Sequence, residues 1–372
     1  MLFKNLYPII SKKVSNANKA GIIRTKDIHS VLVKDLQIRD IFELDTPKID
    51  DLSEILELKK GKVLAVRMDS AYGITGFKKP VVASLILKRT IEAAKHGVIN
   101  NCWIDGGNVN SALALAYYAK KFEGKAAYVI SRLFPDYFIN YVNDTSNYLL
   151  EFIKAPNLKL GIERDFYKYL LDLVRKDPKF RNYQPLWHAK YSGEYTQFIG
   201  LEISEKMKER PDYIVAVIGA GTTIEGQAIP IKKKFHNVPK IVVPEHSKCP
   251  LLSKKKSVED FNDDKKEATT FNCDWFENPP KDLPHMVLGP HYDEINPLLK
   301  ESVFNEIDHV FKYNEEDWEQ MSFKCYNNGL RIGNSSAANL AVAKYLAERG
   351  KTVLTFIYEP FRTIYQGKNF SK

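Results

Sequence analysis

Residues 213–226 read Tyr-Ile-Val-Ala-Val-Ile-Gly-Ala-Gly-Thr-Thr-Ile-Glu-Gly, and this stretch decides the fold. The apolar run at its start is typical of a strand buried on both faces, and the Gly/Thr cluster predicts a tight turn into a helix that begins near Ile224. Backbone N–H groups gather at such a turn and bind anions, phosphate above all. The stretch therefore predicts a strand, a phosphate loop and a helix, with an ordinary turn as the alternative.

The loop fits neither of the two common nucleotide-binding motifs. A dinucleotide fingerprint needs glycine at its sixth position, which is Ile224 here, and a nucleotide-triphosphate loop needs a Gly-Lys-Ser/Thr ending that does not follow. Gly219 and Gly221 allow a ligand to approach the backbone closely, and Thr222 and Thr223 offer hydroxyl donors. We therefore expect a compact terminal phosphate as the ligand.

The composition bounds the class of protein. With 372 residues and 44% hydrophobic content, the chain is long enough to bury the cores of two lobes. Its net charge of +9 comes from dispersed lysines, so we expect an anionic substrate or cofactor rather than a nucleic acid. The sequence has no run of 18 apolar residues and no secretory signal pattern, so we expect a soluble cytosolic protein with no membrane partner. Four scattered cysteines without a Cys-x-x-Cys pair argue against a zinc site or a disulfide framework.

The order of the elements predicts an α/β fold with parallel sheets, because strand and helix patterns alternate along the chain. We expect a surface insertion at residues 247–284, where the rhythm breaks. The expected strands are residues 62–68, 101–104, 125–130, 213–218, 240–243 and 352–358. The expected helices are residues 25–35, 50–58, 80–97, 111–122, 137–154, 164–176, 195–208, 224–235 and 333–349.

A lysine stands where a loop runs into one of these helices. Residues 76–80 read Gly-Phe-Lys-Lys-Pro, and Pro80 suits the first helical position because its missing N–H costs nothing there. Lys78 then lies just before a helix N-terminus, which disfavours a positive charge. Such a lysine is either simply exposed or an amine available as a neutral nucleophile, the state that Schiff-base chemistry requires.

Taken together and in this order, the motifs resemble those of the fold-type II pyridoxal-phosphate enzymes, the group of cysteine synthase, cystathionine β-synthase and the serine/threonine dehydratases. The resemblance covers residues 45–365 and is strongest to the cysteine synthase branch. It is carried by residues 76–80 (the Gly-Ser-Phe/Ile-Lys-Asp-Arg motif), 106–109 (Ser-Gly-Asn-Thr), 195–203 (Thr-Thr-Gly-x-Glu-Ile), 219–223 (Gly-Thr-Gly-Gly-Thr) and 329–336 (Gly-Ile-x-x-Gly-Ile-Ser-Ser).

The resemblance implies a tryptophan synthase β-like fold, with two three-layer αβα lobes and pyridoxal 5'-phosphate in the cleft between them. The larger, cofactor-binding domain would take residues 1–83 and 182–372, and the smaller, mobile domain residues 84–181. A homodimer is also implied.

The resemblance further implies the roles of individual residues. Lys78 would hold the cofactor as an internal aldimine and serve as acid and base, while Asn108 would bind the phenolic oxygen of the ring and Ser335 would face its nitrogen. The phosphate would be held by Gly219, Ala220, Gly221, Thr222 and Thr223. The substrate would be bound by Thr75, Asp105, Gly106, Gly107 and Gln184.

The residue at the ring nitrogen bears on the reaction. A serine hydroxyl does not force protonation of the ring as an aspartate would, and this favours loss of a β-leaving group over transamination. We therefore expect β-replacement with a small nucleophile, or β-elimination, on a serine- or cysteine-type amino acid through an aminoacrylate. Helix N-capping is the other reading of Ser335 and Ser336.

Two departures from the family pattern keep alternatives open. Lys79-Pro80 replaces Asp-Arg, so Lys79 rather than Lys78 could carry the cofactor. Asp105 brings a carboxylate into the substrate loop, and it would repel a substrate carboxylate unless it is turned away; we hypothesise that the substrate is not simply O-acetylserine or is bound in an altered pose. The alternative functions are an ammonia-lyase, dehydratase or racemase on the same cofactor, or a catalytically silent homologue that acts by binding.

Overall fold

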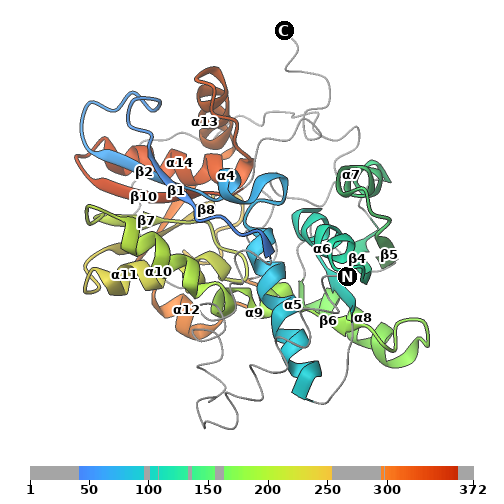
Figure 1. Ribbon diagram of the computed structural model, residues 1–372. Coiled ribbons are helices and arrows are strands. Elements are labelled where there is room, and N and C mark those ends of the chain that lie inside the picture. Colours follow the sequence, from blue (N-terminus) through green and yellow to red (C-terminus); the bar gives the residue numbers. More distant parts are fainter. Residues whose placement is uncertain are drawn as a thin grey trace. The chain divides into compact units, whose positions relative to one another are not determined.

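The computed structural model describes residues 42–95, 101–107, 109–132, 136–155, 163–253, 295–296 and 298–358. The chain forms two compact units: unit 1 comprises Met1–Asp45 and Phe77–Phe198, and unit 2 comprises Thr46–Gly76 and Ile199–Lys372. Each unit has its own β-sheet (Figure 1). The helix expected at residues 25–35 and most of the insertion expected at 247–284 lie outside the described residues.

Unit 1 is built on a parallel sheet whose strand order, within the described residues, is β5-β4-β3-β6. Its strands are β3 (Cys102–Gly106), β4 (Lys125–Ser131), β5 (Glu151–Ala155) and β6 (Gln184–Pro185). Its helices are α5 (Lys78–Lys95), α6 (Val109–Lys121), α7 (Asp136–Ser146), α8 (Glu163–Lys176) and α9 (His188–Tyr195).

The strand order of unit 1 creates a topological switch point. From β3 the chain steps outward through β4 to β5, and then α8 carries it back to β6 on the other side of β3. Because crossovers between parallel strands are right-handed, this reversal puts α8 on the opposite face of the sheet from α6. Ligands of open α/β sheets bind outside the carboxyl ends of the strands at such a point, here after β3 and β6.

Unit 2 is built on a second sheet, in which the described strands have the order β1-β2-β10-β7-β8-β9 and β1 alone runs antiparallel. Its strands are β1 (Lys48–Asp51), β2 (Lys62–Arg67), β7 (Tyr213–Val215), β8 (Lys240–His246), β9 (His309–Tyr313) and β10 (Thr352–Ile357). Its helical segments are α4 (Met68–Tyr72), η1 (Gly73–Thr75), α10 (Gln197–Lys206, which leads in from unit 1), η2 (Ile224–Ala228, a π-helix), α11 (Ile229–Lys234), α12 (Glu301–Asn305), α13 (Glu315–Asn327) and α14 (Asn334–Ala347).

Unit 2 has a switch point of the same kind. The chain steps from β7 through β8 to β9, and α13 and α14 then return it to β10 on the other side of β7. Helix α14 packs on this sheet and α13 packs on α14, while α10 and α11 lie on the other side of the sheet in Figure 1. The carboxyl ends of β7 and β10 are therefore the expected ligand site of unit 2.

The structure corrects three expectations about local structure. The helix expected at residues 50–58 is absent: strand β1 ends at Asp51 and turns follow. The helix expected at 137–154 ends at Ser146, because Asn147 adopts a left-handed conformation (φ 49°) and the chain then forms β5. Helix α5 begins at Lys78, so Pro80 is its third residue; proline is tolerated there because the first four N–H groups of a helix have no intrahelical acceptor.

Candidate active site

The predicted phosphate loop follows β7 at the switch point of unit 2. Helical structure begins at Thr222 and continues through η2 and α11, so residues 219–223 form the N-terminal end of a helix. Within the described residues, no acceptor is found for the backbone N–H groups of Gly219, Ala220 and Gly221. The loop therefore offers three neighbouring N–H donors at a helix N-terminus without an acceptor among the described residues, and such donors can bind an anion.

Two glycines allow the loop to adopt this shape. Gly221 has φ +87°, and a Cβ there would lie 2.8 Å from a methyl carbon of Leu299 and 3.1 Å from one of Val303. Gly200, in the 195–203 motif, packs against η2, and a Cβ at this position would lie 2.6 Å from the carbonyl oxygen of Gly226. Both predicted motifs thus meet behind the loop, and side chains at either glycine would displace it.

A buried amide ties the loop to the neighbouring strand. The Oδ1 of Asn339, on α14, accepts a hydrogen bond of 2.7 Å from the N–H of Val217, and its Nδ2 donates to the carbonyl of Phe356 at 3.2 Å. Thr355 adds a hydrogen bond of 3.0 Å from its hydroxyl to the carbonyl of Val215. Asn339 is fully buried, so it fixes the backbone two residues before Gly219.

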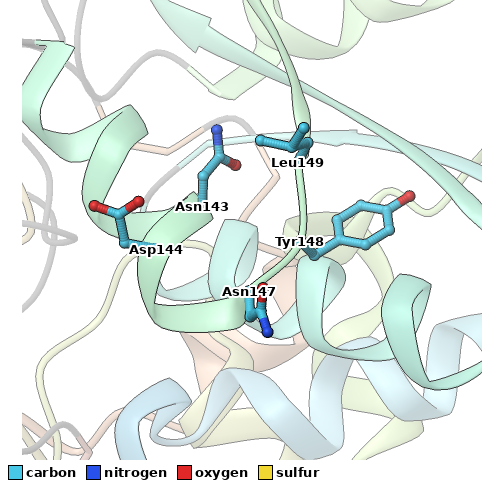
Figure 2. A pocket seen from close by; sticks show the side chains of 5 residues that line it. All are labelled: Asn143, Asp144, Asn147, Tyr148 and Leu149. Atoms are coloured by element: carbon cyan, nitrogen blue, oxygen red, sulfur yellow. The ribbon is translucent and has the colours of Figure 1, made fainter.

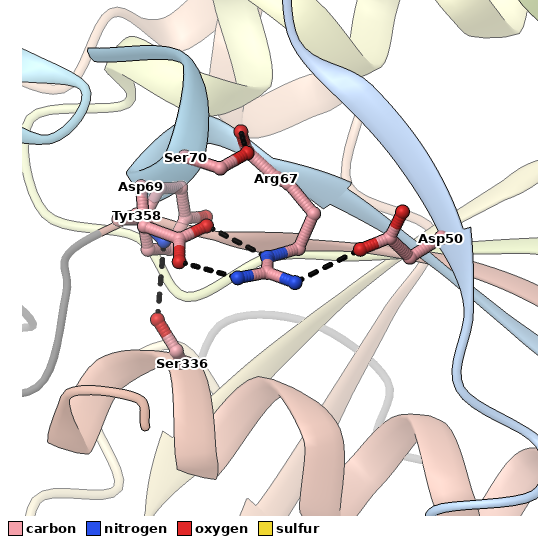
Figure 3. Close-up of polar contacts among 6 residues, drawn as sticks. All are labelled: Asp50, Arg67, Asp69, Ser70, Ser336 and Tyr358. Carbon is pink, nitrogen blue, oxygen red and sulfur yellow. Dashed lines mark hydrogen bonds and ion pairs between the residues drawn. The ribbon is translucent and has the colours of Figure 1, made fainter. Parts of the chain in front are cut away.

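Ser335, which is predicted to face the ring nitrogen, and its neighbour Ser336 lie in the first turn of α14. The N-terminal end of this helix is at the same switch point. The N-cap of α14 is Gly333, so neither serine has the N-cap position that was the alternative reading. Ser336 Oγ accepts a hydrogen bond of 3.1 Å from the N–H of Tyr358, directly after β10 (Figure 3). Ser335, one residue earlier, is 9% exposed.

The phenol of Tyr358 also belongs to this region. Burial raises the pKa of Tyr358 to about 12, while the nearby side chains of Thr223 and Asn339 act in the opposite direction. Tyr358 therefore presents a neutral hydroxyl beside the phosphate loop at physiological pH.

Nearby, an arginine braces the start of the segment that leads to Lys78. Arg67, the last residue of β2, donates from Nε and Nη2 to the carboxylate of Asp69 and from Nη1 to Asp50 (Figure 3). Burial lowers the pKa of the Arg67 guanidinium, but its hydrogen bonds to Asp69 outweigh burial and raise the pKa overall. Thr75, a predicted substrate-binding residue, is buried and donates its hydroxyl to the carbonyl of Tyr72 at 2.9 Å, so its oxygen acts outward only as an acceptor.

In unit 1, the two candidate lysines open α5. Lys79 lies with Nζ 4.7 Å from the ring centroid of Tyr117, and burial lowers its pKa while Glu43 opposes that shift. Lys78 is half-buried at the first helical position. The amine of Lys79 thus makes a cation–π contact with the ring of Tyr117 within unit 1.

The predicted substrate loop follows β3 at the switch point of unit 1. Gly107 has φ +137°, and a Cβ there would lie 3.0 Å from Cε1 of His188 and 3.4 Å from the hydroxyl of Tyr128. Asn108 lies outside the described residues. Asp105 is 1% exposed: its Oδ1 accepts from the N–H of Gly106 at 2.9 Å and its Oδ2 lies 3.1 Å from Nδ1 of His188. The added carboxylate is therefore engaged within unit 1.

Gln184 lies on β6, beside β3. Its Oε1 is buried and has no hydrogen-bond partner in the described part of the chain. Gln184 lines a hollow of about 450 Å³, together with Arg89 and Arg181. Gln184 pairs with Trp103, near the amino end of β3, and an amide with an unmet acceptor is a candidate ligand contact.

A second hollow of unit 1, of about 360 Å³, lies at the turn from α7 to β5 (Figure 2). It is lined by Asn143, Asp144, Asn147, Tyr148 and Leu149. None of the predicted site residues lines it, so we do not assign the reaction to it.

Sequence reasoning missed three residues of these sites: Asn339, Tyr358 and His188. The only signal for Asn339 was a polar residue within an otherwise Ala-rich helix pattern. Tyr358 and His188 carried none, since one follows a strand directly and the other lies in an irregular stretch.

Comparison with known proteins places the chain among relatives of the same fold. The family model described as pyridoxal-phosphate dependent enzyme matches residues 43–357. No sequence among the curated proteins matches this chain.

Three solved structures illustrate the likeness. O-acetylserine sulfhydrylase isoform 3 from Entamoeba histolytica is 17% identical, with a TM-score of 0.63 over 89% of this chain and 92% of that one. O-acetylserine-dependent cystathionine β-synthase from Helicobacter pylori is 18% identical, with a TM-score of 0.65 over 90% and 98%. A hydrogen sulfide-producing enzyme, solved with an α-aminoacrylate intermediate, is 18% identical, with a TM-score of 0.64 over 91% and 93%. The likeness confirms the predicted fold.

No helix of the described residues has the length and apolar character that a membrane span requires.

Proposed function

Because the chain belongs to the pyridoxal-phosphate dependent enzyme family, we propose that it catalyses β-replacement or β-elimination on a serine- or cysteine-type amino acid. The observation that carries the proposal is the coincidence of the motifs with the switch points. The phosphate loop and Ser335 lie at the one in unit 2, and residues 105–107 lie at the one in unit 1. Structural neighbours that use O-acetylserine or form an aminoacrylate support the same reaction class.

The residues of unit 2 fit the cofactor. The N–H groups of residues 219–221 have no acceptor in the part of the chain that the structure describes, and a phosphate would supply acceptors for them. The neutral hydroxyls of Thr223 and Tyr358 add donors without adding negative charge that would repel the phosphate. We therefore assign the phosphate to residues 219–223, with Tyr358 beside them.

The identity of the group at the pyridine nitrogen sets the reaction class. When bound, the cofactor acts as an electron sink for the bonds to Cα, and the protein tunes its strength through the group at that nitrogen. Ser335 would face it with a neutral hydroxyl, and its neighbour Ser336 is held by the N–H of Tyr358. A neutral partner favours departure of a β-substituent over transamination.

We assign the covalent link to Lys78 rather than Lys79. The supporting observation is the position of Lys79 Nζ over the ring of Tyr117, which takes that amine away from other partners. Lys78 would then also move the proton at Cα of the substrate. Gln184, with its unmet Oε1, and the loop of residues 105–108 would bind the amino acid.

The assignment is tested by the absorbance of the purified holoprotein. We expect a yellow cofactor band that is lost in Lys78→Ala and retained in Lys79→Ala, the matched control. Loss of the band in Lys79→Ala alone would contradict the assignment of Lys78. A wild-type protein that takes up no pyridoxal phosphate would refute the proposed function and favour a homologue that acts by binding.

The reaction is tested with a panel of L-serine, L-cysteine, O-acetyl-L-serine and O-phospho-L-serine. We expect at least one to change the cofactor spectrum and, with sulfide present, to yield an amino acid with a new Cβ–S bond by mass spectrometry. Ammonia and a keto acid as sole products would indicate a lyase or dehydratase, and loss of optical activity alone would indicate a racemase.

The proposal extends to assembly and location. A homodimer in the cytosol is what the resemblance to cysteine synthases implies, and light scattering of the purified protein tests the dimer. A monomeric holoenzyme with full activity would contradict it.

A further inference from the structure

The starting point is the buried pair formed by Asp105 and His188. Asp105 lies at the carboxyl end of β3, directly before the substrate loop. His188 is the first residue of α9, three residues after β6. Each side chain is almost completely buried, at 1–2% exposure, and Nδ1 of His188 lies 3.1 Å from Oδ2 of Asp105. The pair therefore stands at the switch point of unit 1, beside the residues assigned to the amino acid.

The residue directly before His188 has an unusual backbone conformation. Trp187, the N-cap of α9, has φ +61° and ψ +47° and makes no side-chain cap hydrogen bond. A residue with a Cβ rarely adopts a left-handed conformation, and such strain persists where the surrounding structure requires it. The bend begins α9 at His188.

The ring of His188 has one engaged and one open nitrogen. The Asp105 carboxylate can only accept, so Nδ1 of His188 carries a hydrogen and donates it. Nε2 has no hydrogen-bond partner within the described residues, and it lies 3.5 Å from the position that a Cβ on Gly107 would take. The open nitrogen thus lies against the glycine that precedes Asn108 in the substrate loop.

A second buried histidine shows what a purely structural pair looks like in this chain. His246, on β8 in unit 2, is 1% exposed; its Nε2 lies 2.6 Å from Oε2 of Glu315, and its Nδ1 accepts from the N–H of Lys248 at 3.1 Å. Both of its ring nitrogens have protein partners. His188 differs because only one of its nitrogens does.

We propose that His188, with a hydrogen on each ring nitrogen in the substrate complex, donates from Nε2 to the α-carboxylate of the amino-acid substrate, and that Asp105 is the positioning residue that holds the ring through Nδ1. The inference rests on the proposed function and adds a residue to its substrate site. It also accounts for the altered loop: the hydroxyl donors that the family pattern would place at residues 105–109 are missing, and the Nε2–H of His188 would take their place.

The test uses the holoenzyme and compares amino acids with their amides. The variants are His188→Gln, Asp105→Asn and the control His246→Gln, and the dissociation constants of L-serine, L-cysteine, L-serinamide and L-cysteinamide are measured from the change in the cofactor spectrum. Charge-assisted hydrogen bonds support an expected loss of about 10- to 100-fold in His188→Gln for the carboxylate forms, with less than about 3-fold for the amides. Asp105→Asn keeps an acceptor for Nδ1 but removes the charge, so we expect a smaller loss with the same selectivity for the carboxylate.

The control separates substrate contact from packing. His246→Gln removes the buried hydrogen bonds that His246 makes with Glu315 and Lys248, and is expected to lower the melting temperature while the dissociation constants of acids and amides stay together. Equal losses of affinity for acids and amides in His188→Gln, or no loss of affinity at all, would overturn the inference. If the cofactor band is still present in that case, the proposed function is not contradicted. If the wild-type chain takes up no cofactor, or neither L-serine nor L-cysteine changes its spectrum, the proposed function fails and the inference fails with it.

Discussion

Replacing Asn339 by alanine should destabilise unit 2 and loosen the phosphate loop at the same time. The amide accepts from Val217 N–H at 2.7 Å and donates to the Phe356 carbonyl at 3.2 Å, and its side chain is fully buried. Truncation leaves the Val217 N–H without an acceptor, and an unsatisfied buried group costs about 1–3 kcal/mol. With the lost packing of the side chain, we expect a loss of about 2–4 kcal/mol.

The effect on the cofactor follows from position along the chain. Val217 lies two residues before Gly219, so freeing its N–H lets the loop move away from the geometry that binds the phosphate. We expect the dissociation constant of pyridoxal phosphate to rise by about tenfold, equivalent to about 1.4 kcal/mol. Thr355→Val is the matched control, because it removes one hydrogen bond to Val215 on the same pair of strands and should cost about 1 kcal/mol with little effect on the cofactor.

The assay is urea unfolding of the apoprotein, combined with cofactor titration of each variant. Apoprotein is needed because bound cofactor adds its own stabilisation to the native state. A loss in Asn339→Ala below about 0.5 kcal/mol, the range of ordinary surface substitutions, would refute the argument from buried hydrogen bonds. A large loss of stability with unchanged cofactor affinity would refute the link from Asn339 to the loop.

Two further predictions concern strain and pH. Gly221→Ala should lower the free energy of unfolding by about 1–2 kcal/mol because of its positive φ and by about 1–3 kcal/mol because of the methyl clash, and it should weaken cofactor binding. Gly350 also has a positive φ (+81°), but a Cβ there would meet nothing within 4 Å. Gly350→Ala should therefore show only the φ effect in the same urea assay. Equal costs for the two variants would contradict the clash. Burial raises the pKa of the Cys325 thiol from 9.0 and of the Tyr195 phenol from 10.0 to about 12 in each case. The unfolded chain therefore loses these protons first, and the stability that they contribute is complete below pH 9.0 and is lost as pH rises toward about 12. Melting temperatures measured across this range should fall, with a smaller fall in Cys325→Ala; a constant melting temperature would be the contrary result.

The elements that could be predicted from the sequence are those whose pattern is local. Strand β4 and helix α6 carry clear apolar runs and lie close to their expected bounds of 125–130 and 111–122. Strand β5 was missed because residues 136–155 have apolar residues at helical spacing throughout, and only the left-handed Asn147 separates helix from strand. Propensity does not reveal where such a break falls.

The same difference between local and long-range information applies to single residues of the candidate site. A glycine and hydroxyl pattern is local, so it predicts a phosphate loop at residues 219–223 without coordinates, and this stays a prediction. The orientation of Asp105 could not, because its partner His188 is 83 residues away and the pairing depends on β6 returning to the far side of β3. A carboxylate that the sequence alone gives as a repulsive group is, in the fold, the acceptor of two hydrogen bonds.

The strand orders give these separate observations a common cause. In each sheet the strand order reverses once, beside β3 in unit 1 and beside β7 in unit 2, and ligands of such sheets bind outside the carboxyl ends of the strands at that point. Residues that follow the later strand of each pair, His188 after β6 and Tyr358 after β10, reach the same switch point as the glycine loops although they are distant in sequence. A short sequence motif contains only the loop that follows the first strand of the pair, β3 or β7. The residues that follow the returning strand are therefore hard to find from a short motif, and in unit 1 His188 has a ring nitrogen without a hydrogen-bond partner among the described residues.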